Sequence, residues 1–213
     1  MRRTASTSSF LRRAAVAASA AAFIFAAFGS TQASASTTRV RPTINTFKAW
    51  DGSQNVIEFG CPNTTTYGQV ITVPAGKTLL NKFTFAWENY AGSGSMVVRG
   101  EVYAWDGTKA TGASVFESGT RTIAFGDALF HKEVFKPNGK SVTPGAQYVL
   151  FASIDKNFEQ CTGSYTLGWA SVADGTYSGG TFVYQNNGGD ESQWTSSSWS
   201  TFGIDLAFKA YLS

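Results

Sequence analysis

Short runs of alternating apolar and polar residues constrain the fold of this chain more than any other feature of its sequence. From about residue 65 these runs follow one another closely, and Gly, Pro, Asn and Asp residues separate them. Alternation with a period of two is typical of half-buried strands, and frequent turn residues are typical of sandwiches and barrels. No window has the period and length of an amphipathic helix. The pattern therefore predicts an all-β fold.

A parallel α/β architecture requires crossover helices, and the sequence shows none. We therefore expect an antiparallel two-sheet sandwich of jelly-roll type, with immunoglobulin-like and lectin-like connectivities left open. The alternating runs number about nine or ten. The expected strands are residues 67–73, 78–88, 95–105, 121–125, 129–135, 147–154, 164–171, 181–185 and 202–212.

Two of these runs predict in detail which side chains face the core. In the run 78–88, Leu79 shares a face with three aromatic residues, and this face is expected to point inward. In the run 202–212, every second residue from Phe202 onward is apolar, which is the cleanest alternation in the chain. We therefore expect Phe202 to lie on the apolar side of one continuous strand.

The first 35 residues have the three parts of a secretory signal peptide. Four arginines precede an uncharged apolar run from Ala14 to Phe28, and Ala33-Ser34-Ala35 matches the small-x-small cleavage pattern. The apolar run is short for a membrane span, although a membrane anchor is the alternative interpretation. We expect cleavage after Ala35, which leaves one exported domain from residue 36 to residue 213 and no later membrane-spanning segment.

Removal of the signal peptide changes the charge of the protein. Four of the seventeen basic residues are the arginines of that segment, so thirteen remain against fourteen acidic residues, a net charge of about −1. Binding to nucleic acid through phosphate contacts requires clustered Lys and Arg residues. The exported domain is therefore not expected to bind nucleic acid.

The exported part contains two cysteines, Cys61 and Cys161. An oxidising compartment favours a disulfide, and only one pairing is possible. Closing a loop of about 100 residues stabilises a fold by about 4–5 kcal/mol in the chain-entropy model. We expect a structural disulfide, because two thiols this far apart in sequence form neither a redox pair nor a zinc site by themselves.

Several ordered landmarks carry a resemblance to a known type of domain. They are Tyr67-Gly68-Gln69, Phe83-x-Phe85, Val102 to Gly107, Tyr148 to Phe151, Tyr177-x-Gly179-Gly180, Trp194 and Asp205 to Phe208. With these landmarks the chain resembles, over about residues 65–212, a β-sandwich domain of bacterial secreted proteins that also occurs in surface proteins with sorting tails. The resemblance implies an extracellular sandwich and assigns no catalytic residue.

Aromatic residues near the C-terminus indicate a possible ligand site. Trp194 and Trp199 lie in a polar segment, and Tyr177 and Tyr184 precede them. A site that stacks a sugar ring on aromatic side chains and binds its hydroxyls with amides and carboxylates suits carbohydrate recognition. Packing at the ends of the sandwich is the alternative role. The predicted ligand-binding residues are Trp194, Trp199, Tyr177, Tyr184, Asn187 and Asp190.

Calcium is the one cofactor for which the sequence offers candidate ligands. Calcium binds six to eight oxygen atoms, and oxygen-rich loops supply them. Neither candidate run matches the twelve-residue calcium loop, and solvated turns explain both runs equally well. We expect no cofactor, with calcium as the alternative. The runs are Asn186, Asn187, Asp190 and Glu191, and Asp155, Asn157 and Glu159.

Catalytic motifs are weak. His131 is the single histidine, and no Gly-x-Ser-x-Gly elbow presents a serine to it. A glycoside hydrolase needs two carboxyl groups about 5–10 Å apart, and Glu88, Glu101 and Glu133 lie on expected strands. Glu101 falls on the amphipathic face of its strand, where we expect contact with solvent or a shallow groove.

The sequence therefore favours a secreted, non-enzymatic β-sandwich that binds a carbohydrate or another extracellular polymer. Replacement of Trp194 by Ala is expected to abolish that binding and leave the fold intact. A structural or protein-interaction module of the cell envelope or matrix is the alternative. A polysaccharide-degrading enzyme on the same fold is the third hypothesis.

Overall fold

The computed structural model describes residues 41–61, 64–91, 95–124, 126–160 and 165–213. These residues form two antiparallel β-sheets that pack face to face, so the predicted all-β two-sheet sandwich is confirmed. The expected signal peptide lies outside the described residues. No helix in the described ranges is long and apolar enough to cross a membrane.

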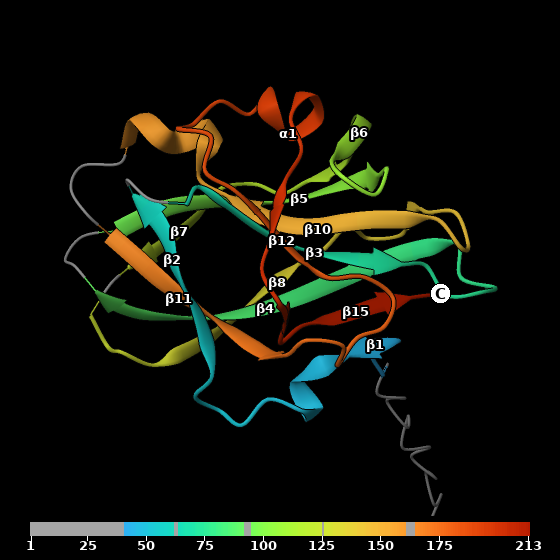
Figure 1. Cartoon of the computed structure of the whole chain (residues 1–213), viewed down its shortest axis with the longest axis horizontal. Helices are drawn as coiled ribbons and strands as arrows, with labels where there is room; N and C mark the ends of the chain where they lie inside the picture. The colour runs from blue at the N-terminus through green and yellow to red at the C-terminus, as the bar shows by residue number, and fades with distance from the viewer. Residues whose placement is uncertain (1–40, 62–63, 92–94, 125, 161–164) are drawn as a thin grey trace, which may run out of the picture. The chain divides into compact units, whose positions relative to one another are not determined.

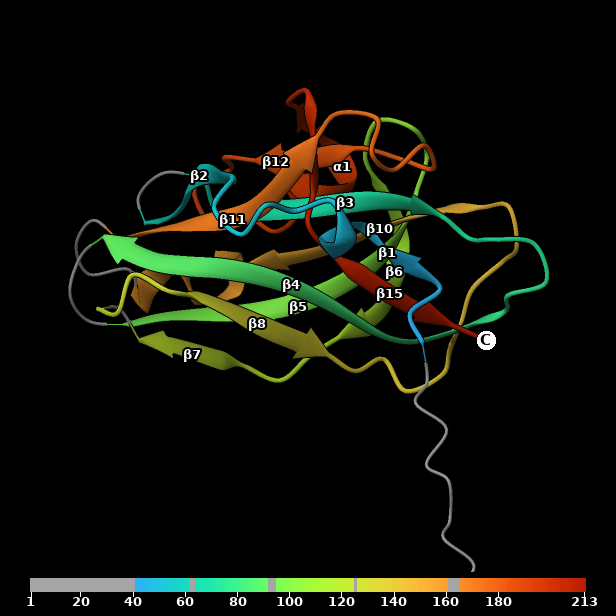
Figure 2. The same cartoon turned by 90° about the horizontal axis from the view of Figure 1, so that it is seen from below.

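The first sheet has eight strands, and its main path runs β1-β15-β4-β11-β14. The long strand β4 organises this sheet, because β15 and β11 line one of its edges and β8 and β9 line the other (Figure 2). Strand β2 pairs with β11. The bounds are β1 Ile44–Asn45, β2 Asn55–Cys61, β4 Leu79–Ala91, β8 Phe130–Phe135, β9 Lys140–Ser141, β11 Tyr165–Ala173, β14 Ile204–Leu206 and β15 Lys209–Leu212.

The second sheet has seven strands in the order β13-β12-β3-β10-β5-β6, with β7 beside β5. The bounds are β3 Thr66–Thr72, β5 Ser95–Trp105, β6 Ala110–Glu117, β7 Arg121–Ala124, β10 Gln147–Ser153, β12 Phe182–Gln185 and β13 Ser200–Thr201. Three short helices accompany the sheets: η1 Thr46–Lys48, η2 Asp155–Gln160 and α1 Gln193–Ser196. In Figure 1, α1 lies beside β6, and β1 lies beside β15.

Large aromatic side chains fill the space between the sheets. Trp87 and Trp169 are fully buried there, with ring centroids 5.0 Å apart. The approach of the sheets is close at Gly100, where an added Cβ would lie 2.2 Å from the ring of Phe135. Only a residue without a side chain fits at this position of β5.

Both outer faces of the sandwich are also covered. On the seven-stranded sheet, Trp194 and Trp199 pack against Phe151 and its outward-facing neighbours. We call residues 186–199, which carry these two tryptophans, the covering segment. On the eight-stranded sheet, Phe47 and Trp50 pack near a patch of small residues that includes Ala86. Strand alternation therefore produces apolar positions on both faces of each sheet.

Two expectations about strand faces are wrong. Leu79 is partly exposed and Leu80 is fully buried, because a bulge in β4 opposite Tyr211 and Leu212 shifts the inward face by one residue. The expected strand 202–212 is two strands, β14 beside β11 and β15 beside β4, and Phe202 is exposed.

Residues before position 65 also contribute to the sheets. Ile44 of β1 and Phe59 of β2 are buried in the core. Cys61, the last residue of β2, is buried and is not a free thiol. Cys161 lies outside the described residues, so its pairing with Cys61 stays a prediction.

Candidate functional site

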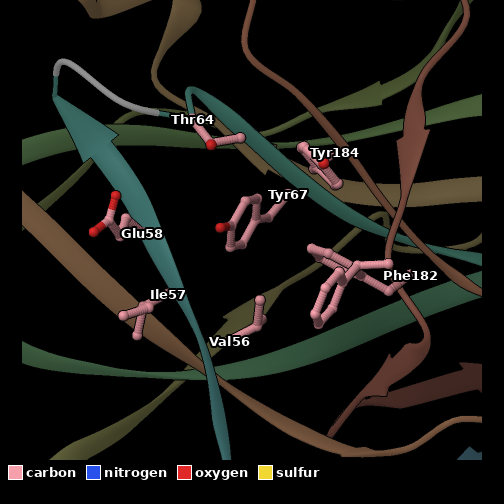
Figure 3. Close-up of a pocket in the computed structure, with 8 residues that line it drawn as sticks. Val56, Ile57, Glu58, Thr64, Tyr67, Phe182 and Tyr184 are labelled. Atoms are coloured by element: carbon pink, nitrogen blue, oxygen red, sulfur yellow. The ribbon is translucent and has the colours of Figure 1, made fainter.

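A cleft opens where the edge of one sheet meets the edge of the other (Figure 3). We call it the aromatic cleft; its volume is about 270 Å³. One wall is the edge strand β2, and the other is built from the inner face of β3 and β12. The lining residues are Val56, Ile57 and Glu58 of β2, Thr64, Tyr67 of β3, Phe182 and Tyr184 of β12, and Phe202.

Strand alternation and ring packing hold the aromatic wall in place. Phe182 and Tyr184 are two residues apart on β12, so their rings lie on the same side and stack with centroids 5.8 Å apart. The ring of Tyr67 packs edge-on against Phe182 at 5.0 Å. Because these rings belong to the main core cluster, the aromatic wall is a rigid extension of the core.

The Tyr67 hydroxyl points toward β2, which carries Glu58 (Figure 3). Burial raises the pKa of this hydroxyl above its usual value, although hydrogen bonds with Thr64 and with the backbone of Glu58 act in the opposite direction. The tyrosine is therefore neutral at physiological pH and can act as a hydrogen-bond donor or acceptor.

A second, more polar hollow adjoins the aromatic cleft. We call it the polar depression; its volume is about 190 Å³. Tyr184 lines both hollows. Ser200 of β13 lines the polar depression, and Phe202, two residues later, lines the aromatic cleft. The remaining lining residues carry amide or hydroxyl groups: Gln185, Asn186, Asn187, Gln193, Ser197 and Ser198.

Two of the predicted ligand-binding residues, Trp194 and Trp199, are buried, with 2% and 6% of their surface exposed. The indole of Trp194 donates a hydrogen bond to Asp155 Oδ2 at 2.7 Å, and that of Trp199 donates to the Trp194 carbonyl at 2.9 Å. The two rings therefore have little exposed surface on which a sugar could stack. Their apolar area is already used to attach the covering segment to the sheet.

Two other predicted residues support local structure. The hydroxyl of Tyr177 donates to the Thr72 carbonyl at 3.2 Å and accepts a bond from the Thr72 amide at 3.1 Å. Asp190 accepts hydrogen bonds from Ser192 and from Gln193, and these bonds lower the pKa of its carboxyl. Of the six predicted residues, only Tyr184 and Asn187 line a hollow.

The two oxygen-rich runs considered for calcium meet in space. Asn187 donates a hydrogen bond from Nδ2 to Asp155 Oδ2 at 2.6 Å, so a side-chain nitrogen faces the buried carboxylate. Within the described residues, no group of three His, Cys, Asp or Glu side chains is placed to hold a metal ion.

The candidate catalytic carboxylates have separate environments. Glu133 pairs with Arg121 at 3.2 Å, whereas Glu88 contacts Asn55 on the eight-stranded sheet. Glu101 lies on the seven-stranded sheet and is fully buried, so the expected contact with solvent is wrong. The single histidine, His131, is exposed and contacts Asp127 at 2.6 Å.

Most of the aromatic cleft was missed by reading the sequence. The first strand was expected at residue 67, although the β-branched and aromatic residues of Val56-Ile57-Glu58-Phe59 are a strand signal. Phe202 was expected on the apolar side of the C-terminal strand because it continues the alternation of that run. Its exposure follows from the turn between β13 and β14, which no pattern of period two reveals.

Comparison with models of protein families, with curated proteins and with solved structures found no match for this chain.

Proposed function

We propose that this chain is a secreted, non-enzymatic β-sandwich that binds a carbohydrate or another extracellular polymer along the aromatic cleft and the polar depression. The observation that carries the proposal is that Tyr184 lines both hollows. The signal-peptide pattern of the first 35 residues supports export.

The chemistry of the two hollows suits a sugar chain. Sugar rings have apolar faces, which pack on aromatic side chains, and hydroxyl edges, which bind amides and hydroxyls. Tyr184 and the exposed Phe202 supply aromatic surface beside the buried rings of Tyr67 and Phe182, and the polar depression supplies amides such as Asn187. A polymer with two adjacent units can contact both hollows at once.

The proposal includes no cleavage of the polymer, because no pair of carboxylates lines the two hollows within the described part of the chain. Among the described residues that line them, Glu58 is the one carboxylate. Hydrolysis of a glycosidic bond by the usual mechanism requires two.

The test is retention of the purified protein on a panel of insoluble polysaccharides, with new reducing ends assayed in the same tubes. Phe202→Ala is the informative variant, because Phe202 is 61% exposed and its removal leaves the core intact. We expect this change to weaken retention about tenfold through loss of an aromatic contact. We also expect no new reducing ends.

Leu129→Ala is the matched control, because Leu129 is equally exposed at 61% but does not line either hollow. If both variants and the unmodified protein were retained equally, the cleft would not be the binding site. New reducing ends would show an enzyme. Absence of retention on every polymer would favour the structural or protein-interaction module, for which exposed Ile57 and Phe202 are a possible contact surface.

A further inference from the structure

The outer face of the eight-stranded sheet carries three lysines on neighbouring strands. Lys82 belongs to β4, Lys132 to β8 and Lys209 to β15, and β4 lies between the other two strands. Lys132 stands opposite Ala86 of β4, and Lys209 stands opposite Thr84. These positions alternate with the buried aromatic residues of β4, so all three lysines are on the side that points away from the core. We call the three lysines the lysine patch.

Aromatic rings lie beside the ammonium groups of the lysine patch. Lys82 Nζ is 4.0 Å from the centroid of the Tyr211 ring. Lys132 Nζ and Lys209 Nζ are 5.4 Å and 5.3 Å from the centroid of the Phe47 ring. Two ammonium groups therefore meet at one ring. These contacts position the lysines, and they leave the positive charges without a counter-ion.

The positive charge of the lysine patch is not balanced by acidic side chains. Among the described residues, no ion pair includes any of the three lysines. Glu88, farther along the same face of β4, contacts Asn55 instead. Partial burial lowers the pKa of Lys209, and repulsion from Lys132 and from Lys82 lowers it further. A bound anion would relieve this repulsion.

The composition of this surface favours an acidic sugar chain over a nucleic acid. Sugar rings have apolar faces that pack on aromatic side chains, and Phe47 and Tyr211 are both half-buried. Adjacent strands are about 4.8 Å apart, so the lysine patch extends about 10 Å across the sheet and can contact successive units of a chain. The net charge after residue 35 is about −1, whereas nucleic-acid binding requires a larger basic surface.

We propose that the lysine patch binds an acidic polysaccharide, a sugar chain that carries carboxylate or sulfate groups. In this arrangement the acidic groups lie between neighbouring ammonium groups, and a sugar face packs beside Phe47 or Tyr211. The inference goes beyond the proposed function, because none of the three lysines lines the aromatic cleft or the polar depression. It gives the sandwich a second binding surface.

The experiment measures the affinity of the purified protein for three oligosaccharides of equal length by isothermal titration calorimetry. They are an oligogalacturonate, a heparin fragment and a neutral maltooligosaccharide. At low salt we expect both acidic chains to bind at least about tenfold more tightly than the neutral chain. This preference should disappear as NaCl rises from about 0.05 M to about 0.5 M, because salt screens exposed charges. Lys132→Gln and Lys209→Gln should each weaken binding of the acidic chains about threefold, and the double variant about tenfold.

Lys109→Gln is the matched control, because it removes one positive charge just before β6, on the other sheet. It changes the net charge as much as either single variant and should weaken binding less than about twofold. Thermal unfolding checks that every variant folds. Lys132 is exposed, so its replacement leaves the core intact.

Equal affinity for the acidic and neutral chains, or equal effects of Lys132→Gln and Lys109→Gln, overturns this inference. Single-stranded oligothymidylate of equal length is the remaining probe. If it binds as tightly as the acidic sugars, the patch is a general polyanion surface, and the assignment to a polysaccharide is also overturned. If the acidic chains fail while Phe202→Ala still weakens retention on the polysaccharide panel, this inference falls and the proposed function stands.

Discussion

The buried carboxyl of Glu101 is the least expected residue in the fold. It lies on the outer face of β5, where Lys156 Nζ approaches Oε1 at 3.5 Å and Ser114 donates a hydrogen bond to Oε2 at 3.4 Å. Lys156 also contacts Glu117 at 2.8 Å and Glu191 at 3.5 Å, so one ammonium group serves three carboxyl groups. Full burial of the carboxyl makes ionisation of Glu101 unfavourable.

This environment predicts how stability depends on pH. Burial raises the pKa of Glu101 to about 8, and the attraction to Lys156 offsets only part of the effect. Between about pH 4.5 and pH 8 the folded protein keeps the proton that the unfolded chain releases, so the contribution of Glu101 to stability decreases as pH rises. Glu101→Gln keeps a neutral group at this position at every pH. We expect it to stabilise the protein at neutral pH by about 2–4 kcal/mol and to have little effect at pH 4.

Urea unfolding at a series of pH values measures this effect. Glu117→Gln is the control, because the hydrogen bond from Lys156 lowers the pKa of Glu117 and gives the opposite sign. Glu117 contributes stability above its unfolded pKa, and that contribution is lost as pH falls. Because Glu117 is about a third exposed, the loss should be below about 1 kcal/mol. A stability difference between Glu101→Gln and the unmodified protein that is the same at all pH values would contradict the prediction.

At the scale of elements, the covering segment shows why aromatic residues in a polar loop need not be ligand contacts. Trp194 fills the outer face of the seven-stranded sheet against Phe151, with ring centroids 5.0 Å apart. Its indole also donates a hydrogen bond to Oδ2 of Asp155 on η2. The segment is therefore attached by packing and by a buried hydrogen bond at the same residue.

Trp194→Phe separates these two contributions, because it keeps most of the apolar area and removes the donor to Asp155. We expect a loss of about 1–3 kcal/mol, since a buried carboxylate loses a charge-assisted hydrogen bond. Trp194→Ala should lose about 3–5 kcal/mol, so it is not the fold-neutral change that the sequence suggested. Thermal unfolding measures both losses.

Trp50→Phe is the matched control for the lost hydrogen bond. The Trp50 indole donates to the Gln54 carbonyl at 2.7 Å in an exposed setting, where water can replace the bond. The control should cost less than about 1 kcal/mol. If the two Trp→Phe changes have equal effects, the bond to Asp155 does not hold the covering segment.

The sequence predicted the positions of the strands better than it predicted which side chains of each strand face the core. Strands β3, β5 and β10 were located nearly to the residue, because each is a long alternating run bounded by turn residues. The bulge in β4 could not be read, since it depends on the pairing with β15. The packing of the covering segment on the outer face of the seven-stranded sheet could not be predicted either. An alternation with a period of two does not tell which face of a sheet another segment will cover. For this reason the predicted ligand site combined the two buried tryptophans with Tyr184 and Asn187, which line the polar depression.

At the scale of the whole molecule, the chain crosses repeatedly between the sheets. Strands β3, β5, β10 and β12 belong to the seven-stranded sheet, and β4, β8, β11 and β15 belong to the other. The N-terminal strand β1 pairs with β15 near the C-terminus. In the next residue after β1, Thr46, Oγ1 donates a hydrogen bond to the Leu206 carbonyl at 2.7 Å. Contacts between distant parts of the sequence therefore dominate the fold, and a covalent link between such parts would stabilise it strongly.

The predicted disulfide is such a link, and its position connects it to the proposed function. Cys61 ends β2, the strand that supplies Glu58 and one wall of the aromatic cleft, and it pairs across the sheet with Tyr165 at the start of β11. If Cys161 is its partner, reduction frees a loop of about 100 residues and should destabilise the protein by about 2–5 kcal/mol, or about 5–15 °C in Tm.

Differential scanning calorimetry with and without reductant measures that shift, and alkylation followed by mass spectrometry counts the thiols. We expect no alkylation before reduction and two modified cysteines after it. The Cys61→Ser, Cys161→Ser double variant should reproduce the lower Tm without reductant and should also bind the polymer more weakly, because β2 loses an anchor beside the cleft. Alkylation of either cysteine in the unreduced protein would contradict the disulfide. Unchanged binding by the double variant would show that pairing with β11 alone holds this wall of the cleft.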